Sequence, residues 1–298
     1  MEFVLHPVPP FRLDLTACVL RRMPINKMDR WDGTYRRILL VRDELIEVSV
    51  SQSGSIEKPE LLVSIDLQNI DDAQREIIAS YLNRILGLDI DLTDFYKLAD
   101  SDSKLYGLVG RFEGFKPPRA ASIFEALVNA IACQQLSLTV GITLLNRLST
   151  AYGKSHGEYH AFPQPIELVD ASTDKLRTLG FSTRKAEYIT HISRMIVNNE
   201  LDLESLALMD DNLVVDTLLK IHGIGRWTAE YIALRGLGRL DVYPADDIGS
   251  QNKLQHWFNM TARPDYQGVH NIIDKWSSYR GMIYFHLLLD TLERQGLL

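Results

Sequence analysis

Two features of residues 218–247 have the residue types and spacing for chemistry beside a phosphate. One is a Gly-x-Gly turn made by Gly223 and Gly225, and the other is Asp247, which ends a Pro-Ala-Asp-Asp run. Glycines admit a positive φ and a close backbone approach, and the N–H groups that open a helix can bind an anion. A carboxylate nearby can stabilise developing positive charge or orient water. Together they indicate an enzyme that acts on nucleic acid, although a tight turn and a helix cap explain each feature alone.

Apolar periodicity places the turn between two helices. Leu218, Leu219 and Ile221 close the first helix, and Trp227 and Tyr231 lie four residues apart on one face of the second. Two aromatic rings on one face can line a pocket whose π surfaces attract an electron-poor or cationic base. The alternative is that both rings belong to the core of the helix packing.

The chain resembles the helix-hairpin-helix DNA glycosylases, and within them the 3-methyladenine DNA glycosylase II branch. The motifs are I-H-G-I-G-R-W-T-A-E-Y-I-A-L-R at 221–235, D-V-Y-P-A-D-D at 241–247, F-E-A-L with I-A-C-Q-Q-L-S within 124–137, and L-G-F-S at 179–182. The similarity is clear from about 105 to 290 and weaker over 1–95. The combination of these motifs is more specific than the hairpin alone.

The resemblance implies roles for several side chains in a reaction on a flipped base. Asp247 aligns with the catalytic carboxylate, and Asp246 is left as a helix cap or an orienting residue. Trp227, Tyr231 and Phe285 would form the base pocket, although Phe285 taken alone fits the core equally. Because bifunctional relatives carry a lysine nucleophile where Trp227 stands, the sequence favours a monofunctional hydrolase with water as nucleophile.

The resemblance also implies a DNA-binding set from two turns. Its members are Gln134, Gln135, His222, Gly223, Gly225 and Arg226. Gln135 aligns with the wedge that fills the gap left by a flipped base, where the alkylpurine branch has an apolar residue. A plain surface turn is the alternative for this segment. Lys220 and Arg235 are candidates for further phosphate contacts.

We expect no required cofactor. The backbone carbonyls of Leu219, Ile221 and Ile224 align with those that hold a monovalent cation in the family, which predicts an optional structural Na⁺ or K⁺ at the hairpin. The iron–sulfur branch needs four closely spaced cysteines near the C-terminus, and no cysteine follows Cys133. We therefore expect no iron–sulfur cluster.

The pattern predicts an α+β fold, with an N-terminal antiparallel-sheet domain at 1–104 followed by an all-α helix-hairpin-helix glycosylase core at 105–298. Alternating residues predict strands at 11–15, 35–41, 45–50 and 61–65, and helical periodicity predicts a helix at 73–86. Further helices are predicted at 122–133, 137–152, 166–171, 173–179, 182–198, 203–207, 210–221, 225–235, 247–258, 268–275 and 279–295. Residues 156–165 are predicted to form a loop.

Composition sets limits on where the chain works. A net charge of −7 over 298 residues argues against a broadly basic surface, so DNA binding must use a local patch and backbone N–H groups. Cys18 and Cys133 show no metal-ligand spacing and fit a reducing compartment. Without a signal pattern or an apolar run of ~18 residues, we expect a cytoplasmic, DNA-associated protein with no membrane partner. We expect it to act as a monomer on double-stranded DNA that contains damaged bases.

These expectations form one hypothesis, a monofunctional DNA N-glycosylase of base excision repair. It flips alkylated purines out of the duplex and hydrolyses their N-glycosidic bond with the help of Asp247. Bases of the 3-methyladenine and 7-methylguanine type are cationic and leave without a strong general acid. Two alternatives remain, a glycosylase for oxidised or deaminated bases and a non-catalytic helix-hairpin-helix DNA-binding protein. Trp227 disfavours a lyase, and Asp247 disfavours a protein that only binds.

Overall fold

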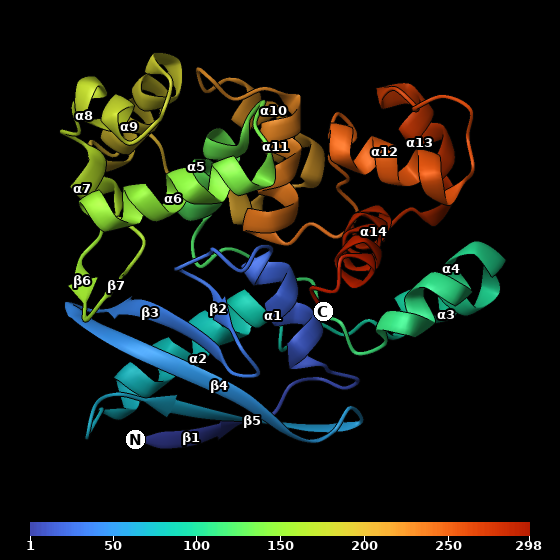
Figure 1. Cartoon of the computed structure of the whole chain (residues 1–298), viewed down its shortest axis with the longest axis horizontal. Coiled ribbons are helices and arrows are strands. Elements are labelled where there is room, and N and C mark those ends of the chain that lie inside the picture. The colour runs from blue at the N-terminus through green and yellow to red at the C-terminus, as the bar shows by residue number, and fades with distance from the viewer.

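The computed structural model describes residues 1–298 and has a sheet at the N-terminal end and helices beyond it (Figure 1). The sheet is antiparallel throughout, with strand order β1-β5-β4-β3-β2. Its strands are β1 (Glu2–Leu5), β2 (Arg30–Trp31), β3 (Tyr35–Val41), β4 (Glu44–Ser55) and β5 (Lys58–Ile65). The α+β fold class is therefore confirmed, as are the strands predicted at 35–41, 45–50 and 61–65.

The buried face of the sheet is covered by α1 (Leu13–Arg21) and α2 (Asp72–Leu86). The predicted helix at 73–86 is confirmed as α2, and its ends have the expected local signals. Asp71 and Gln74 form a capping box at its start, and Gly87 adopts the left-handed conformation at its end. The packing of α2 explains why alternate residues of the sheet strands are buried.

The strand predicted at 11–15 is wrong, because α1 begins at Leu13. Side chains of this helix are buried on nearly all sides, since it lies between two cores. Leu13, Ala17 and Leu20 contact the sheet core, whereas Leu15, Cys18 and Val19 contact a helical core. Residues 11–15 resemble a strand because Phe11, Leu13 and Leu15 are buried and the two residues between them are only half-buried. Only the last three of these five residues are helical, which is too few to show a helical period.

The helical part has two cores. The first contains α5 (Ile123–Cys133), α6 (Leu138–Tyr152), α7 (Pro165–Leu168), α8 (Thr173–Thr178), α9 (Thr183–Val197), α10 (Asp211–Leu219) and α11 (Arg226–Ile232). The second contains α3 (Thr93–Ser101), α4 (Ser103–Val109), α12 (Ile248–Trp257), α13 (Tyr266–Ile273) and α14 (Arg280–Arg294), together with one face of α1. No helix is both long enough and apolar enough to cross a membrane.

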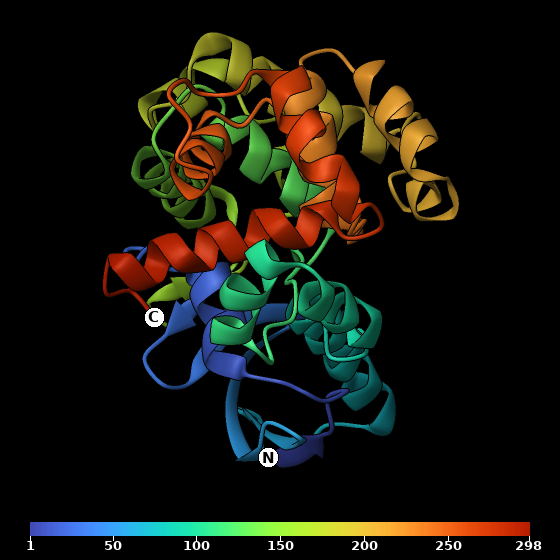
Figure 2. The same cartoon turned by 90° about the vertical axis from the view of Figure 1, so that its right-hand side faces the viewer.

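Most predicted helices of this part are confirmed, with ends shifted by a few residues. Shorter 3-10 or π segments occupy Gly110–Phe112, Glu204–Leu208, Ala233–Leu237 and Asp274–Trp276. The predicted loop at 156–165 includes part of a small hairpin of β6 (Ser155–His156) and β7 (Tyr159–His160). The predicted domain boundary at 104/105 falls inside α4, and α14 runs between the N-terminal part, which holds the sheet with α1 to α4, and the helices from α5 onward (Figure 2). That division stays a prediction.

A buried ionic cluster joins the sheet to the first helical core. Arg37 of β3 donates to Asp29 Oδ1 over 2.7 Å and also to the Glu125 carboxylate on α5. Tyr35 donates its hydroxyl to the same Asp29 oxygen over 2.8 Å. Buried charges are tolerated only when paired and hydrogen bonded, so this cluster fixes how α5 sits on the sheet.

Candidate active site

A cleft of about 1120 Å³ opens between the two helical cores and is lined from both. The turn between α5 and α6 and the start of α11 contribute one set of residues, and the start of α12 with α14 contributes the other. The cleft brings together most residues implied by the resemblance, which are Gln134, Gln135, Gly223, Gly225, Arg226, Trp227, Tyr231 and Asp247. His222 and Phe285 do not line it.

Asp247 is the N-cap of α12, and its carboxylate is held by three donors. Its Oδ1 accepts the backbone N–H of Ser250 over 2.8 Å. Its Oδ2 accepts the indole N–H of Trp227 over 3.2 Å and the hydroxyl of Tyr284 over 3.0 Å. Donors on both oxygens fix the orientation of the carboxylate in the cleft. Asp246 is not the cap; it is exposed and lies 3.9 Å from Arg226.

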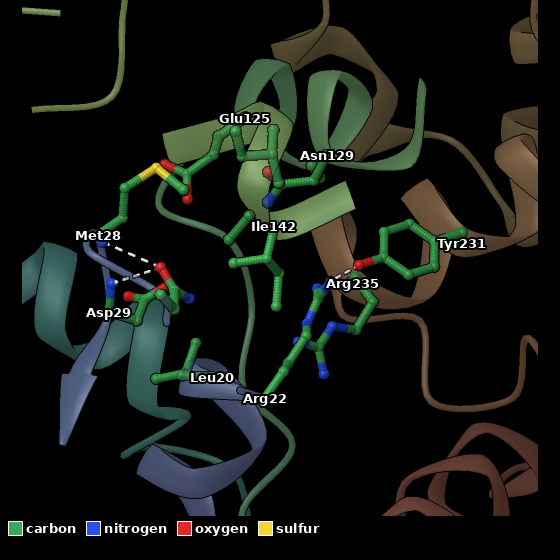
Figure 3. Close-up of a pocket in the computed structure, with 13 residues that line it drawn as sticks. Leu20, Arg22, Met28, Asp29, Glu125, Asn129, Ile142, Tyr231 and Arg235 are labelled. Atoms are coloured by element: carbon green, nitrogen blue, oxygen red, sulfur yellow. Dashed lines mark hydrogen bonds between the residues drawn. The ribbon is translucent and has the colours of Figure 1, made fainter. Parts of the chain in front are cut away.

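Trp227 and Tyr231 lie together on the cleft face of α11, as their spacing predicts. Their ring centroids are 5.4 Å apart, with an interplanar angle of 33°. The hydroxyl of Tyr231 accepts a hydrogen bond from Arg22, which reaches it from the end of α1 (Figure 3). The Arg22 guanidinium also lies 5.7 Å from the centre of the Tyr231 ring. One wall of the pocket therefore depends on a residue from the N-terminal part.

The prediction that Phe285 lines the base pocket is wrong, because its side chain is 0% exposed and packs in the second helical core. The neighbouring Tyr284 faces the cleft instead, together with Leu288 one helical turn later. Arg235 separates Phe285 from the cleft, with its guanidinium 5.2 Å from the Phe285 ring centre. The aromatic residue of α14 that lines the cleft is thus one position before the one that the resemblance implied, and each residue turns a helix by about 100°.

The hairpin between α10 and α11 uses its two glycines differently. Gly223 has φ +92°, and a Cβ there would lie 2.4 Å from the Tyr188 ring. Gly225 has φ −91°, with nothing within 4 Å of an added Cβ, and no side chain caps the start of α11. Gly223 thus serves the fold, while Gly225 leaves open space beside the first N–H groups of the helix. His222 is exposed and packs edge-on against Tyr188, with centroids 5.1 Å apart.

The three hairpin carbonyls differ in their partners. The Ile221 carbonyl accepts the N–H of Ile224 over 3.1 Å, whereas the carbonyls of Leu219 and Ile224 accept no hydrogen bond from the protein. No group of three or more His, Cys, Asp or Glu side chains is placed to hold a metal. Free carbonyl oxygens suit a hard monovalent cation, so these residues fit the ion that the resemblance implies.

Gln134 and Gln135 have different roles in the turn after α5. Gln134 donates its side-chain amide to the Gly223 carbonyl over 3.3 Å and to the Thr228 hydroxyl over 3.0 Å, so it braces the hairpin. Gln135 is exposed and has φ +54°. Leu136 beside it is also exposed, at 43%, and lines the same cleft. An apolar side chain is therefore present at the turn, one residue beyond the aligned wedge position.

The cleft is locally basic although the chain is acidic. Among its lining side chains, Arg22, Arg226, Arg235 and Lys253 outnumber the acids Asp246 and Asp247. Arg235 is only 4% exposed, and burial lowers its pKa to about 10. Burial also lowers the pKa of Lys253, and the nearby Asp247 carboxylate partly offsets this effect by raising the same pKa. Of these four cations only Arg226 is exposed, and Arg235 is buried, so a polyanion would meet the positive charge of the cleft mainly at Arg226.

Sequence reasoning missed several residues of the site. Arg22, Tyr284 and Lys253 line the cleft, and Glu230 lies directly behind the loop that carries Asp247. Arg22 and Tyr284 lie far along the chain from the hairpin, so no local pattern points to them. Lys253 lies on α12 six positions after Asp247, and six residues turn a helix by about 600°, so the two do not share a helix face and their spacing gave no signal.

Comparisons with known proteins identify the family of this chain. Residues 128–278 match the family model "HhH-GPD superfamily base excision DNA repair protein". A putative DNA-3-methyladenine glycosylase of Bacillus subtilis is 30% identical over 274 residues, covering 91% of this chain and 92% of that protein. A second Bacillus subtilis protein, a DNA-3-methyladenine glycosylase, is 29% identical over 249 residues, covering 82% of this chain and 80% of its own.

A solved structure shows the same architecture over nearly the whole chain. The 3-methyladenine DNA-glycosylase from Archaeoglobus fulgidus superposes with a TM-score of 0.82 at 26% identity, covering 98% of this chain and 99% of that one. The likeness therefore includes the sheet as well as the helices. The chain belongs to the HhH-GPD superfamily of base excision DNA repair proteins.

Proposed function

We propose that this protein is a monofunctional DNA N-glycosylase that removes alkylated purines of the 3-methyladenine and 7-methylguanine type. The observation that carries the proposal is the Asp247 carboxylate, which is held in the cleft by Trp227 and Tyr284 beside an aromatic surface. The relatives named DNA-3-methyladenine glycosylase, which align over most of the chain, support the same substrate class.

The reaction assigns one task to each group. The flipped base stacks on Trp227 and Tyr231, whose π faces attract a cationic ring. The C1′–N bond breaks and its electron pair leaves with the base, so a cationic base departs neutral and needs no strong acid. Asp247 stabilises the positive charge that develops on the sugar, and water adds at C1′ and loses its proton. Because residue 227 is tryptophan, no amine stands at that position to form a Schiff base.

Double-stranded DNA would be bound by backbone groups and a local basic patch. The start of α11 at Gly225, which no side chain caps, and Arg226 beside it would contact the phosphates. A Na⁺ or K⁺ held by the carbonyls of Leu219, Ile221 and Ile224 would add a bridge to a phosphate. Gln135 and Leu136 lie at the cleft edge, where a side chain could fill the gap left by the flipped base.

Base release from methylated duplex DNA tests the proposal, with Asp246→Asn as the matched control for Asp247→Asn. Asparagine remains a good N-cap, so Asp247→Asn keeps the cap of α12 while it removes the charge and replaces the oxygen that accepts from Trp227 and Tyr284 with an amide NH₂ group. We expect single-turnover release of 3-methyladenine and 7-methylguanine to fall by about 10²-fold or more in Asp247→Asn and to persist in Asp246→Asn. Equal release by wild type and Asp247→Asn contradicts the assignment. Tight binding to methylated DNA without release would indicate a protein that only binds.

A further inference from the structure

Behind the Asp247 loop lies a buried carboxylate that no step of the reaction uses. Glu230 is 5% exposed and lies on α11, three residues after Trp227. Its Oε2 accepts the backbone N–H of Ala245 over 3.1 Å, and its Oε1 accepts the Tyr266 hydroxyl of α13 over 3.0 Å. No cationic side chain forms an ion pair with it, which is unusual for a buried acid.

Ala245 is held from two sides, two residues before Asp247. Glu230 binds its N–H from α11, and the side-chain amide of Gln251 on α12 donates to its carbonyl over 2.8 Å. Gln251 is itself buried. The short segment from Ala245 to Asp247 is therefore fixed at its start by hydrogen bonds and at its end by the start of α12.

We propose that Glu230 is a positioning residue for the glycosylase reaction, which fixes Ala245 and thereby sets the Asp247 carboxylate against C1′ of the bound nucleotide. The inference rests on the proposed function of Asp247. Trp227 donates to the Asp247 carboxylate, and Glu230 accepts the N–H of Ala245 in the loop that carries Asp247. Both side chains come from α11, so the two contacts move together. A displacement of about 1 Å at a reacting group can cost about 10²-fold in rate.

The charge of Glu230 adds a property that packing alone would not have. Burial raises the pKa of Glu230 to about 7, although the hydrogen bonds from Tyr266 and Ala245 lower it. The charged groups that face it are Asp246, which raises the pKa, and Arg226, which lowers it. An ionised acceptor holds an N–H more strongly than a neutral one. The loop is therefore held more tightly as the pH rises through about 7.

Two substitutions separate this role from a merely structural one. Glu230→Gln keeps the size and an acceptor for Ala245 but stays neutral at every pH. We expect its single-turnover rate at pH 8 to fall by about 10-fold, with little change in DNA affinity, and its rate to lack the rise near pH 7 that we expect of the wild type. Tyr266→Phe removes a donor to the carboxylate, so the same rise should move to higher pH.

The measurement is single-turnover release of 7-methylguanine from duplex DNA between pH 5.5 and 8.5, corrected for uncatalysed release. Glu76→Gln, at an exposed position on α2, is the control and should match the wild type. Thermal unfolding of each variant shows whether the fold is intact. A Glu230→Gln protein with the wild-type rate and pH profile, or one that loses only DNA affinity, overturns the inference. If the wild type releases another base but no methylpurine, the proposed substrate fails and the pH comparison is made on that base.

Discussion

Trp227 donates its indole N–H to the Asp247 carboxylate across the cleft, over 3.2 Å. The residue that stands where a lysine nucleophile would act therefore orients the acid that we propose for catalysis. Tyr284 donates to the same Oδ2 atom from α14. One oxygen is thus held by two aromatic side chains from different cores, and this leads to the first prediction.

Removing either aromatic donor should slow base release without unfolding the protein. A hydrogen bond to a charged group is worth about 1.5–3 kcal/mol, so we expect Tyr284→Phe to lower the single-turnover rate by about 10-fold or more. Trp227→Phe should lower it further, because the pocket also loses stacking area. Tyr279→Phe, which changes a phenol of the same region outside the cleft, is the control. Unchanged rates in both cleft variants would show that the carboxylate needs no such orientation.

The two hairpin glycines should respond differently to alanine. At Gly223 an added Cβ meets Tyr188 at 2.4 Å, and φ +92° is unfavourable for any side chain. We expect Gly223→Ala to lose about 1–2 kcal/mol or more of unfolding free energy, measured by urea denaturation. At Gly225 the space is open, so Gly225→Ala should keep its stability and weaken only DNA binding, measured by fluorescence anisotropy. Equal stability losses at both positions would contradict this division.

The basic residue of the hairpin should be visible in the salt dependence of DNA binding. Arg226 is exposed in the cleft and lies 3.9 Å from Asp246. If it neutralises one phosphate, Arg226→Gln should reduce the slope of log K against log salt by about 1. Binding isotherms at several salt concentrations measure this slope, with Arg177→Gln on α8 as a control away from the cleft. A slope unchanged by Arg226→Gln would remove the hairpin arginine from the phosphate contacts.

The ionic cluster of Arg37, Asp29 and Glu125 should make a large contribution to the free energy that holds the sheet against the helices. Glu125→Ala leaves Arg37 buried beside Asp29 alone, and breaking a buried pair costs about 3–5 kcal/mol. We expect a loss of that order in urea denaturation. The double change Arg37→Met with Glu125→Leu should lose more stability than the single change, since it leaves the buried Asp29 carboxylate without a cationic partner. A single variant as stable as the wild type would show that the cluster is not holding α5.

The sequence predicts the parts of this site that depend on neighbours along the chain. The hairpin glycines, the shared face of Trp227 and Tyr231, and the loop that enters α12 at Asp247 all depend on short spacing. The structure places these residues in one cleft. Two predictions were wrong because they depend on which side chains are buried, and burial is set by contacts with other elements. Residues 11–15 alternate between buried and half-buried side chains because they include the start of α1, where a helical period is not yet visible. The aromatic residue of α14 that lines the cleft is Tyr284, one position before Phe285.

Local sequence patterns do not reveal contacts between segments that are far apart in the chain. Arg22 binds Tyr231 across 209 positions of sequence, and Tyr266 binds Glu230 across 36. Glu230 lies within the motif at 221–235, and its position on an otherwise buried helix face was the sign of it in the sequence. Such groups become visible only when the fold shows which buried polar atoms meet.

The position of Arg22 has a consequence for how the molecule can be divided. Because this arginine follows α1 and reaches the base pocket, the sheet part supplies a piece of the pocket wall as well as support. A fragment that begins at residue 105 would have Tyr231 without its partner and the second helical core without α1. Two separately made fragments should therefore restore a working pocket only when they associate.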